Sequence, residues 1–82
     1  MNEELLQMLT TGQVRVVFTK RTNGIIRNLL GTLNRTLIPP EQYTTLSTVL
    51  ASRNPNLVVL WDIEVNDWRS FYISSVIKLF PV

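Results

Sequence analysis

The sequence contains neither cysteine nor histidine. Without cysteine, the chain can form neither a disulfide nor a thiolate metal site. Without histidine, it lacks the commonest metal ligand, the usual acid/base group of enzymes and the base of a serine–histidine–aspartate triad. No apolar run reaches the ~18 residues of a membrane span, and the acidic start of the chain is unlike a signal peptide. We therefore expect a soluble protein that makes no membrane contact.

Acidic residues are missing from one long stretch of the chain. Residues 11–38 carry a formal charge of +5, whereas the flanking segments together carry −3, which leaves a total of +2. A block of one sign attracts phosphates or an acidic protein surface. The cations of this block are Arg15, Lys20, Arg21, Arg27 and Arg35.

Hydrophobic residues, in contrast, are abundant for the size of the chain. Its 82 residues predict a single domain spanning residues 1–82, with a core of limited size. Yet 45% of the residues are hydrophobic and the mean hydropathy is +0.14. Apolar atoms on a protein surface are ordinary. The alternative is that a partner or a second subunit covers part of this surface.

A short amphipathic helix is predicted over residues 2–10. Asn2 is a suitable N-cap, and the acidic residues that follow it suit the positive end of the helix dipole. A nine-residue helix is unstable alone, so it must dock on its own domain or on a twin subunit. The predicted oligomer or partner interface consists of Leu5, Leu6, Met8 and Leu9.

Residues 13–34 predict a first β-hairpin. Apolar residues alternate along Gln13–Thr19, and Asn23-Gly24 is a typical hairpin turn because both residue types accept a positive φ. Arg15 and Arg27 lie on the two paired strands, and we expect them to share one face. Glycine at position 31 weakens a strand unless the backbone bends or is closely approached there.

The second half of the sequence predicts a connecting segment and three further strands. Residues 41–52 form a helix or an irregular segment, since their threonine and serine content disfavours a regular helix. Residues 57–80 contain a second hairpin and a last short strand. Five short strands with tight turns predict a mainly β fold: a small five-stranded barrel with an N-terminal helix and a short connecting helix.

Several motifs resemble those of a known family. Val16-Val17-Phe18-Thr19-Lys20, the Thr32-Leu33-Asn34 ending and the later Trp61-Asp62 and Trp68-Arg69-Ser70-Phe71 segments are similar to small tailed-phage proteins of the WYL-related, Sm-like β-barrel family. The resemblance covers roughly residues 13–80, and the Trp-Arg-Ser-Phe segment is its most specific part. It implies an Sm-like (Src-homology-type) barrel, a phage origin and a place in the host cell cytoplasm.

The basic block is the leading candidate for a functional site. Small barrels bind single-stranded nucleic acid through a basic groove with aromatic stacking, and Arg69 beside Trp68 adds a further cation. The alternative for the block is a solvated face. For Trp68 it is packing in the core, which we favour because aromatic side chains supply much of the core area in a small domain. The predicted nucleic-acid-binding residues are Arg15, Lys20, Arg21, Arg27, Arg35 and Arg69.

The carboxylates give little reason to expect catalysis or a metal. Asp62, Glu64 and Asp67 flank a single turn, where aspartate commonly makes local hydrogen bonds. The sequence also has no glycine-rich phosphate loop and no nucleophile–base pair. We therefore predict no catalytic residue, no metal site and no cofactor.

These observations lead to two hypotheses about function. The first is a non-enzymatic phage accessory protein that binds nucleic acid through the basic first hairpin, with RNA slightly favoured over single-stranded DNA, and acts on a host regulatory or defence system. The alternative is an inhibitor of a host nuclease or toxin that uses the basic hairpin to meet an acidic protein. A homo-oligomer, most simply a dimer, is expected in either case, because the strand edges of an open barrel can pair between subunits.

Overall fold

Two hairpins and a last strand form one antiparallel sheet in the order β4-β3-β2-β1-β5. The computed structural model describes residues 2–52 and 54–82. Its elements are α1 (Glu3–Thr11), β1 (Gln13–Thr19), β2 (Ile26–Thr32), η1 (Arg35–Leu37), η2 (Pro40–Gln42), α2 (Tyr43–Ala51), β3 (Leu57–Asp62), β4 (Asp67–Tyr72), η3 (Ile73–Ser75) and β5 (Val76–Pro81). The prediction of five strands with an N-terminal and a connecting helix is confirmed.

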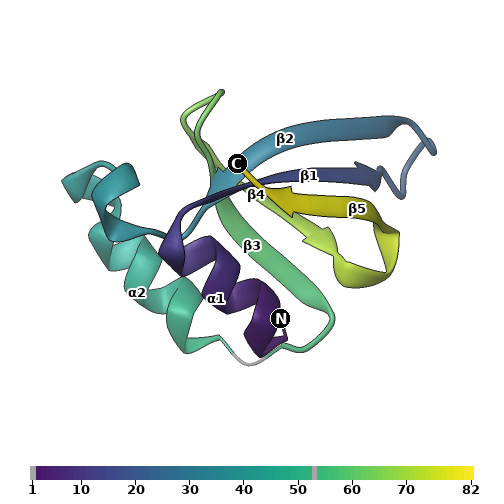
Figure 1. The fold of residues 1–82 in the computed structure, drawn as a ribbon. Helices are drawn as coiled ribbons and strands as arrows, with labels where there is room; N and C mark the ends of the chain where they lie inside the picture. Colours follow the sequence, from purple (N-terminus) through teal and green to yellow (C-terminus); the bar gives the residue numbers. More distant parts are fainter. Residues whose placement is uncertain (1, 53) are drawn as a thin grey trace.

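The sheet bends sharply between β2 and β3. Seven residue pairs join β1 to β2, but β2 meets β3 only at Gly31–Asp62 and Thr32–Trp61. The first residues of β2 therefore diverge from β3, and the sheet divides into a β5-β1-β2 half and a β3-β4 half (Figure 1). The helices lie at one side of this bent sheet, and the tip of the β1–β2 hairpin points to the opposite side.

The core fills the inside of the bend. Along β1 the residues alternate between buried and half-buried, as the sequence pattern predicts for a strand with one face toward the core. The rings of Phe18 on β1 and Phe71 on β4 stack with their centroids 4.7 Å apart. This aromatic pair joins the two halves of the sheet at the end away from the helices.

Gly31 lies where the backbone of β2 is approached most closely. A Cβ at this position would lie 2.7 Å from both Cδ atoms of Leu60, a side chain with no exposed surface. The absence of a side chain therefore lets β2 and β3 cross at the point where the sheet bends. This close approach is the structural reason for a glycine in the strand.

Gly31→Ala is expected to lower the free energy of unfolding by about 1–3 kcal/mol, because the new Cβ would force the buried Leu60 side chain to shift within the core. Urea denaturation followed by tryptophan fluorescence measures the change. Gly12→Ala is the matched control, since nothing lies within 4 Å of a Cβ built there. We expect the control to change stability by less than about 0.5 kcal/mol. Equal stability of the two variants would contradict the proposed packing.

The helix α1 belongs to the core of its own chain. The side chain of Asn2 caps the helix by accepting a hydrogen bond from the Leu5 amide at 2.7 Å. Leu5 and Leu9 are almost completely buried, and the Thr32 hydroxyl donates to the Gly12 carbonyl at 2.7 Å and also lies 3.2 Å from the Leu9 carbonyl. The prediction of an interface at Leu5, Leu6, Met8 and Leu9 is therefore wrong for Leu5 and Leu9. The other two, Leu6 and Met8, are partly buried against the same core.

The connecting segment is more ordered than its composition suggests. A 3-10 turn that begins at Pro40 leads into α2, whose Leu46 is buried in the core. Tyr43, Val49 and Leu50 pack against the core from the same helix. This face of α2 therefore lies on the chain's own core.

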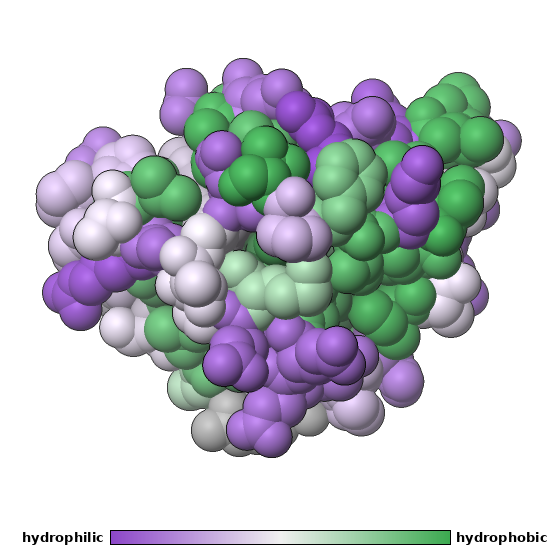
Figure 2. Space-filling view, in the orientation of Figure 1, coloured by the Kyte–Doolittle hydropathy of each residue, from purple (hydrophilic) through white to green (hydrophobic). Residues whose placement is uncertain are grey.

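The exposed apolar surface lies elsewhere. Figure 2 shows hydrophobic side chains gathered on the side of β5 and at the tip of the β1–β2 hairpin. The large hydrophobic residues that remain exposed are Ile25, Ile26, Leu37, Val65, Tyr72, Ile77, Phe80 and Val82. None of these residues lies on α1 or α2, so the exposed hydrophobic surface is found on the strands, the connections and η1.

Candidate functional site

A concavity opens where β2 diverges from β3. It has a volume of about 420 Å³ and lies between the start of β2 and the facing residues of β4. The stacked ring of Phe18 contributes to its lining. The lining residues are Phe18, Lys20, Arg27, Asn28, Leu29, Asp62, Glu64, Val65, Trp68, Arg69 and Ser70. The bend of the sheet thus produces a hollow that is lined by several basic residues.

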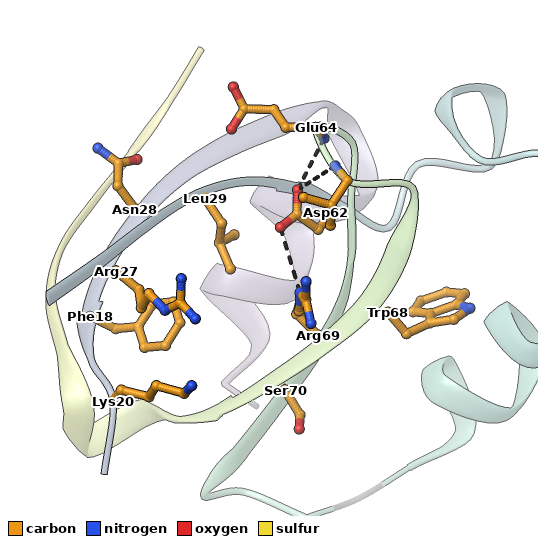
Figure 3. A pocket seen from close by; sticks show the side chains of 11 residues that line it. Phe18, Lys20, Arg27, Asn28, Leu29, Asp62, Glu64, Trp68, Arg69 and Ser70 are labelled. Atoms are coloured by element: carbon orange, nitrogen blue, oxygen red, sulfur yellow. Dashed lines mark hydrogen bonds and ion pairs between the residues drawn. The ribbon is translucent and has the colours of Figure 1, made fainter. Parts of the chain in front are cut away.

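Three cations reach this hollow from different parts of the sheet. Lys20 follows β1, Arg27 lies on β2 and Arg69 lies on β4 (Figure 3). Arg69 approaches Asp62 at 3.9 Å, but within residues 2–52 and 54–82 neither Lys20 nor Arg27 forms an ion pair. The hollow therefore carries positive charge that the described part of the protein does not neutralise.

A second concavity of about 370 Å³ adjoins the first and shares Phe18, Lys20 and Ser70 with it. It adds Arg21 and Tyr72, whose ring lies 4.4 Å from the guanidinium carbon of Arg21. We call the two concavities together the basic groove. Four of the six predicted nucleic-acid-binding residues lie in it: Lys20, Arg21, Arg27 and Arg69.

Arg15 lies on the other face of the sheet from Arg27. In the hairpin register Phe18 is opposite Arg27, whereas Arg15 is opposite Leu30. Because side chains alternate along a strand, this register places Arg27 on the face of Phe18 and Arg15 on the reverse face. There Arg15 forms an ion pair with Glu64 at 3.0 Å. The prediction that the two arginines share one face is wrong.

Arg35 is also outside the groove. It lies in η1, close to the helices and away from the hairpin tip (Figure 1). Its guanidinium carbon lies 4.3 Å from the ring centroid of Tyr43. The tyrosine hydroxyl in turn donates to the Arg35 carbonyl at 3.1 Å. The basic block of the sequence therefore does not form one continuous surface.

The carboxylates near the groove stabilise a turn, as the sequence predicts. The side chain of Asp62 accepts hydrogen bonds from the amides of Glu64 and Val65 at 3.0 and 3.4 Å. The Asn66 amide donates to the Asp62 carbonyl, and Asn66 has a φ of 55°. Asp62 is thereby committed to holding the β3–β4 turn, which places Arg69 opposite Arg27.

Trp68 packs against the core, in agreement with the prediction we favoured. Its ring meets Trp61 edge-on with centroids 5.3 Å apart, and its indole N–H donates to Gln42 at 3.0 Å. Figure 3 shows its ring directed away from the hollow. Of the other aromatic side chains that line the two concavities, Tyr72 is exposed, whereas Phe18 is buried against Phe71. Tyr72 is absent from the residues that the sequence predicted for the site, although it directly follows the Trp68-Arg69-Ser70-Phe71 motif.

The described residues were also compared with the requirements of a metal site and of a membrane-spanning helix. Within residues 2–52 and 54–82, no group of three carboxylate side chains is placed to hold a metal ion. No helix in this part of the chain has the length and apolar character needed to cross a membrane.

The fold and the groove define a class of protein: a small Sm-like barrel in which a bent five-stranded sheet carries a basic concavity. Residues 2–77 match the family described as WYL_2, Sm-like SH3 beta-barrel fold, and the chain belongs to that family. The resemblance seen in the sequence motifs is thus confirmed, as is the predicted barrel fold.

A phage protein is among the relatives of this chain. Over 77 residues it is 30% identical to the "Uncharacterized 11.5 kDa protein in Gp31-cd intergenic region" of Enterobacteria phage T4. The alignment covers 94% of this chain and 74% of the T4 protein. No solved structure matches the chain. Because the relative's name describes no activity, the function must be argued from the groove.

Proposed function

We propose that this protein binds single-stranded nucleic acid, either RNA or DNA, in the basic groove and catalyses no reaction. One observation carries the proposal. Lys20, just after β1, and Arg27, on β2, reach the same concavity, and neither forms an ion pair among the described residues. Phosphate groups are the natural counter-charge for such a pair.

The dimensions of the groove favour an unpaired strand over a duplex. Each concavity has the volume of a small-ligand site, which ranges from about 300 to 1,000 Å³. Such a hollow can receive a single nucleotide but cannot enclose a double helix. Proteins that bind single strands combine a positive groove with aromatic rings on which bases stack. Tyr72, 41% exposed, supplies such a ring, which a base would reach once Arg21 turns to a phosphate.

The salt dependence of binding tests this proposal. If all four groove cations meet phosphates of a single strand, log K should fall with log salt at a slope of about −3. Fluorescence anisotropy with a labelled 20-nucleotide heteropolymer, once as RNA and once as DNA, measures the slope. Saturable binding that is independent of salt, or no binding at all, would contradict the proposal.

The same cations could meet an acidic protein surface, for example on a host nuclease or toxin. A pull-down from infected host extract, with and without nuclease treatment, separates the two partners. We expect the partner to be lost on nuclease treatment, since it is held through RNA of a host regulatory or defence complex. A partner retained after nuclease treatment would indicate direct protein contact.

A further inference from the structure

The charge of the basic groove is unevenly distributed along its length. In the first concavity the acidic side chains lie at the β3–β4 turn, where Asp62 accepts hydrogen bonds from the turn amides and lies 3.9 Å from Arg69. The other acid, Glu64, is paired with Arg15. Among the described residues that line the second concavity, none is acidic. The positive charge of the groove therefore declines toward the turn, whereas a strand can continue through the second concavity.

Unpaired positive charge gathers at the other side of the first concavity. Figure 3 shows the charged ends of Lys20 and Arg27 on the same side of the hollow, with the ring of Phe18 between them and the carboxylates of the turn further off. Neither cation has an ion-pair partner in the part of the chain that the structure describes. Phe18 is only 9% exposed and stacks on Phe71, so the surface between the two cations is apolar. Above such a surface, water weakens charge interactions less than it does in open solution.

This pair of cations matches a phosphate monoester better than a phosphodiester. A phosphate inside a strand carries one negative charge, whereas a phosphate monoester carries about −1.5 to −2 at pH 7. An internal phosphate would leave part of the charge of Lys20 and Arg27 unbalanced, whereas a monoester balances both and offers three acceptor oxygens. A monoester occurs only at the end of a strand. That position agrees with a groove whose positive charge declines toward the turn.

We propose that the groove holds a terminal phosphate of a single strand between Lys20 and Arg27, while the strand leaves through the second concavity. The inference rests on the proposed function and names its substrate class: single-stranded RNA or DNA with a phosphate monoester at one end. The first base then lies over the second concavity, where Tyr72 supplies a ring, and the next phosphate meets Arg21. A 5′-phosphate and a 3′-phosphate share this chemistry, and the test distinguishes them.

Competition against a labelled 20-nucleotide strand with hydroxyl ends measures the preference. Three unlabelled ten-nucleotide competitors share one sequence and carry hydroxyl groups at both ends, a 5′-phosphate or a 3′-phosphate. We expect one of the two phosphorylated strands to bind about tenfold more tightly than the hydroxyl-ended strand, because one further charge-assisted contact is worth roughly a factor of ten. A hydroxyl-ended competitor of eleven nucleotides, which adds one internal phosphate, should gain less than about twofold.

The preference should also depend on pH, in a way set by the ligand. The second ionisation of a phosphate monoester lies near pH 6. The chain contains no histidine, the side chain that ordinarily titrates in this range. Lowering the pH from about 7.5 to about 5 should therefore reduce the tenfold preference to about threefold or less, as the monoester loses its second negative charge. A preference that is unchanged over this range would contradict a dianion held between the two cations.

A pair of variants places the terminal phosphate within the groove. Arg27→Gln should reduce the preference for the phosphorylated strand from about tenfold to about threefold or less, because it removes one of the two cations that face the monoester. Arg21→Gln is the matched control, since it removes the same charge from the second concavity alone. It should weaken the binding of every strand but keep the tenfold ratio. Thermal melting followed by circular dichroism confirms that both variants are folded. A ratio that survives in Arg27→Gln, or is lost in Arg21→Gln, overturns the inference.

Failure of this inference differs from failure of the proposed function. Single-strand binding with equal affinity for phosphorylated and hydroxyl-ended strands overturns the inference and leaves the proposed function intact. An equal gain from a phosphate at either end does the same, because it would reflect added charge and not a site for one end of the strand. Absence of single-strand binding overturns both.

Discussion

Lys20→Glu/Arg27→Glu is expected to lower the affinity for a single-stranded oligonucleotide by about 100-fold or more. Lys20, just after β1, and Arg27, on β2, face one concavity and have no ion-pair partner among the described residues. Hydrogen bonds to charged groups contribute about 1.5–3 kcal/mol each, and every 1.4 kcal/mol is a factor of ten in affinity. The reversed charges would also repel phosphates. Fluorescence anisotropy at about 0.15 M salt measures the loss.

The matched control is Arg35→Glu/Lys78→Glu. Both double variants change the formal net charge from +2 to −2, so they differ only in where the charge changes. Arg35 and Lys78 lie over the rings of Tyr43 and Phe80, outside the groove. We expect the control to lose less than about threefold in affinity, through long-range electrostatics alone. Equal losses in the two variants would show that net charge, and not the groove, governs binding.

The second large effect concerns the helix α1. Leu9→Ala is expected to lower the free energy of unfolding by about 2–5 kcal/mol, since Leu9 has no exposed surface and its removal leaves a cavity in the core. That is a large part of the 5–15 kcal/mol that stabilises a typical domain. Urea denaturation measures the loss. Leu6→Ala is the control with a smaller effect, because Leu6 is only partly buried.

Leu9→Ala also decides between two roles of α1. If the helix served as an interface between subunits, the variant would lose its partner but keep its stability. Analytical ultracentrifugation measures the mass of wild type and variant under the same conditions. A dimer that dissociates without a loss of stability would contradict the packing of α1 on its own domain.

The sequence predicted the positions of the helices and strands better than it predicted which side chains each of them buries or exposes. Alternation over Gln13–Thr19 identified β1, and Asn2 was correctly predicted as the N-cap of α1. These are local signals, set by the period of a strand and by the hydrogen bonds of a helix end. The family motifs predicted that the strands form a barrel. Local patterns indicate a barrel only through the number of short strands.

The composition of the site depended on information that is not local. The hairpin register and the length of the turn decide whether Arg15 and Arg27 lie on the same face of the sheet. A shift of the register by one residue would move Arg27 to the opposite face. The groove exists because β2 and β3 pair at only two positions and diverge beyond them. One of these positions is Gly31, where the Leu60 side chain comes close to the backbone of β2. Arg69 reaches the groove from β4, far from the basic block in the sequence, and was expected only because it follows Trp68.

The fate of the apolar surplus illustrates the same limit. Leu5 and Leu9 were predicted to contact a partner, because the apolar face of a short amphipathic helix is easily recognised in a sequence. In the structure they are buried, and Ile25 and Ile26 at a turn remain exposed instead. Burial depends on which elements cover one another, and a linear pattern does not contain that information.

The salt dependence of the wild type beside the neutralised variant Lys20→Ala/Arg27→Ala tests the central claim most directly. Binding of a single strand in the basic groove predicts a slope of log K against log salt of about −3 for the wild type and about −1.4 for the variant, which retains Arg21 and Arg69. The same slope in both proteins would show that nucleic acid binds elsewhere. A slope near zero in both would show that the groove cations meet no phosphates.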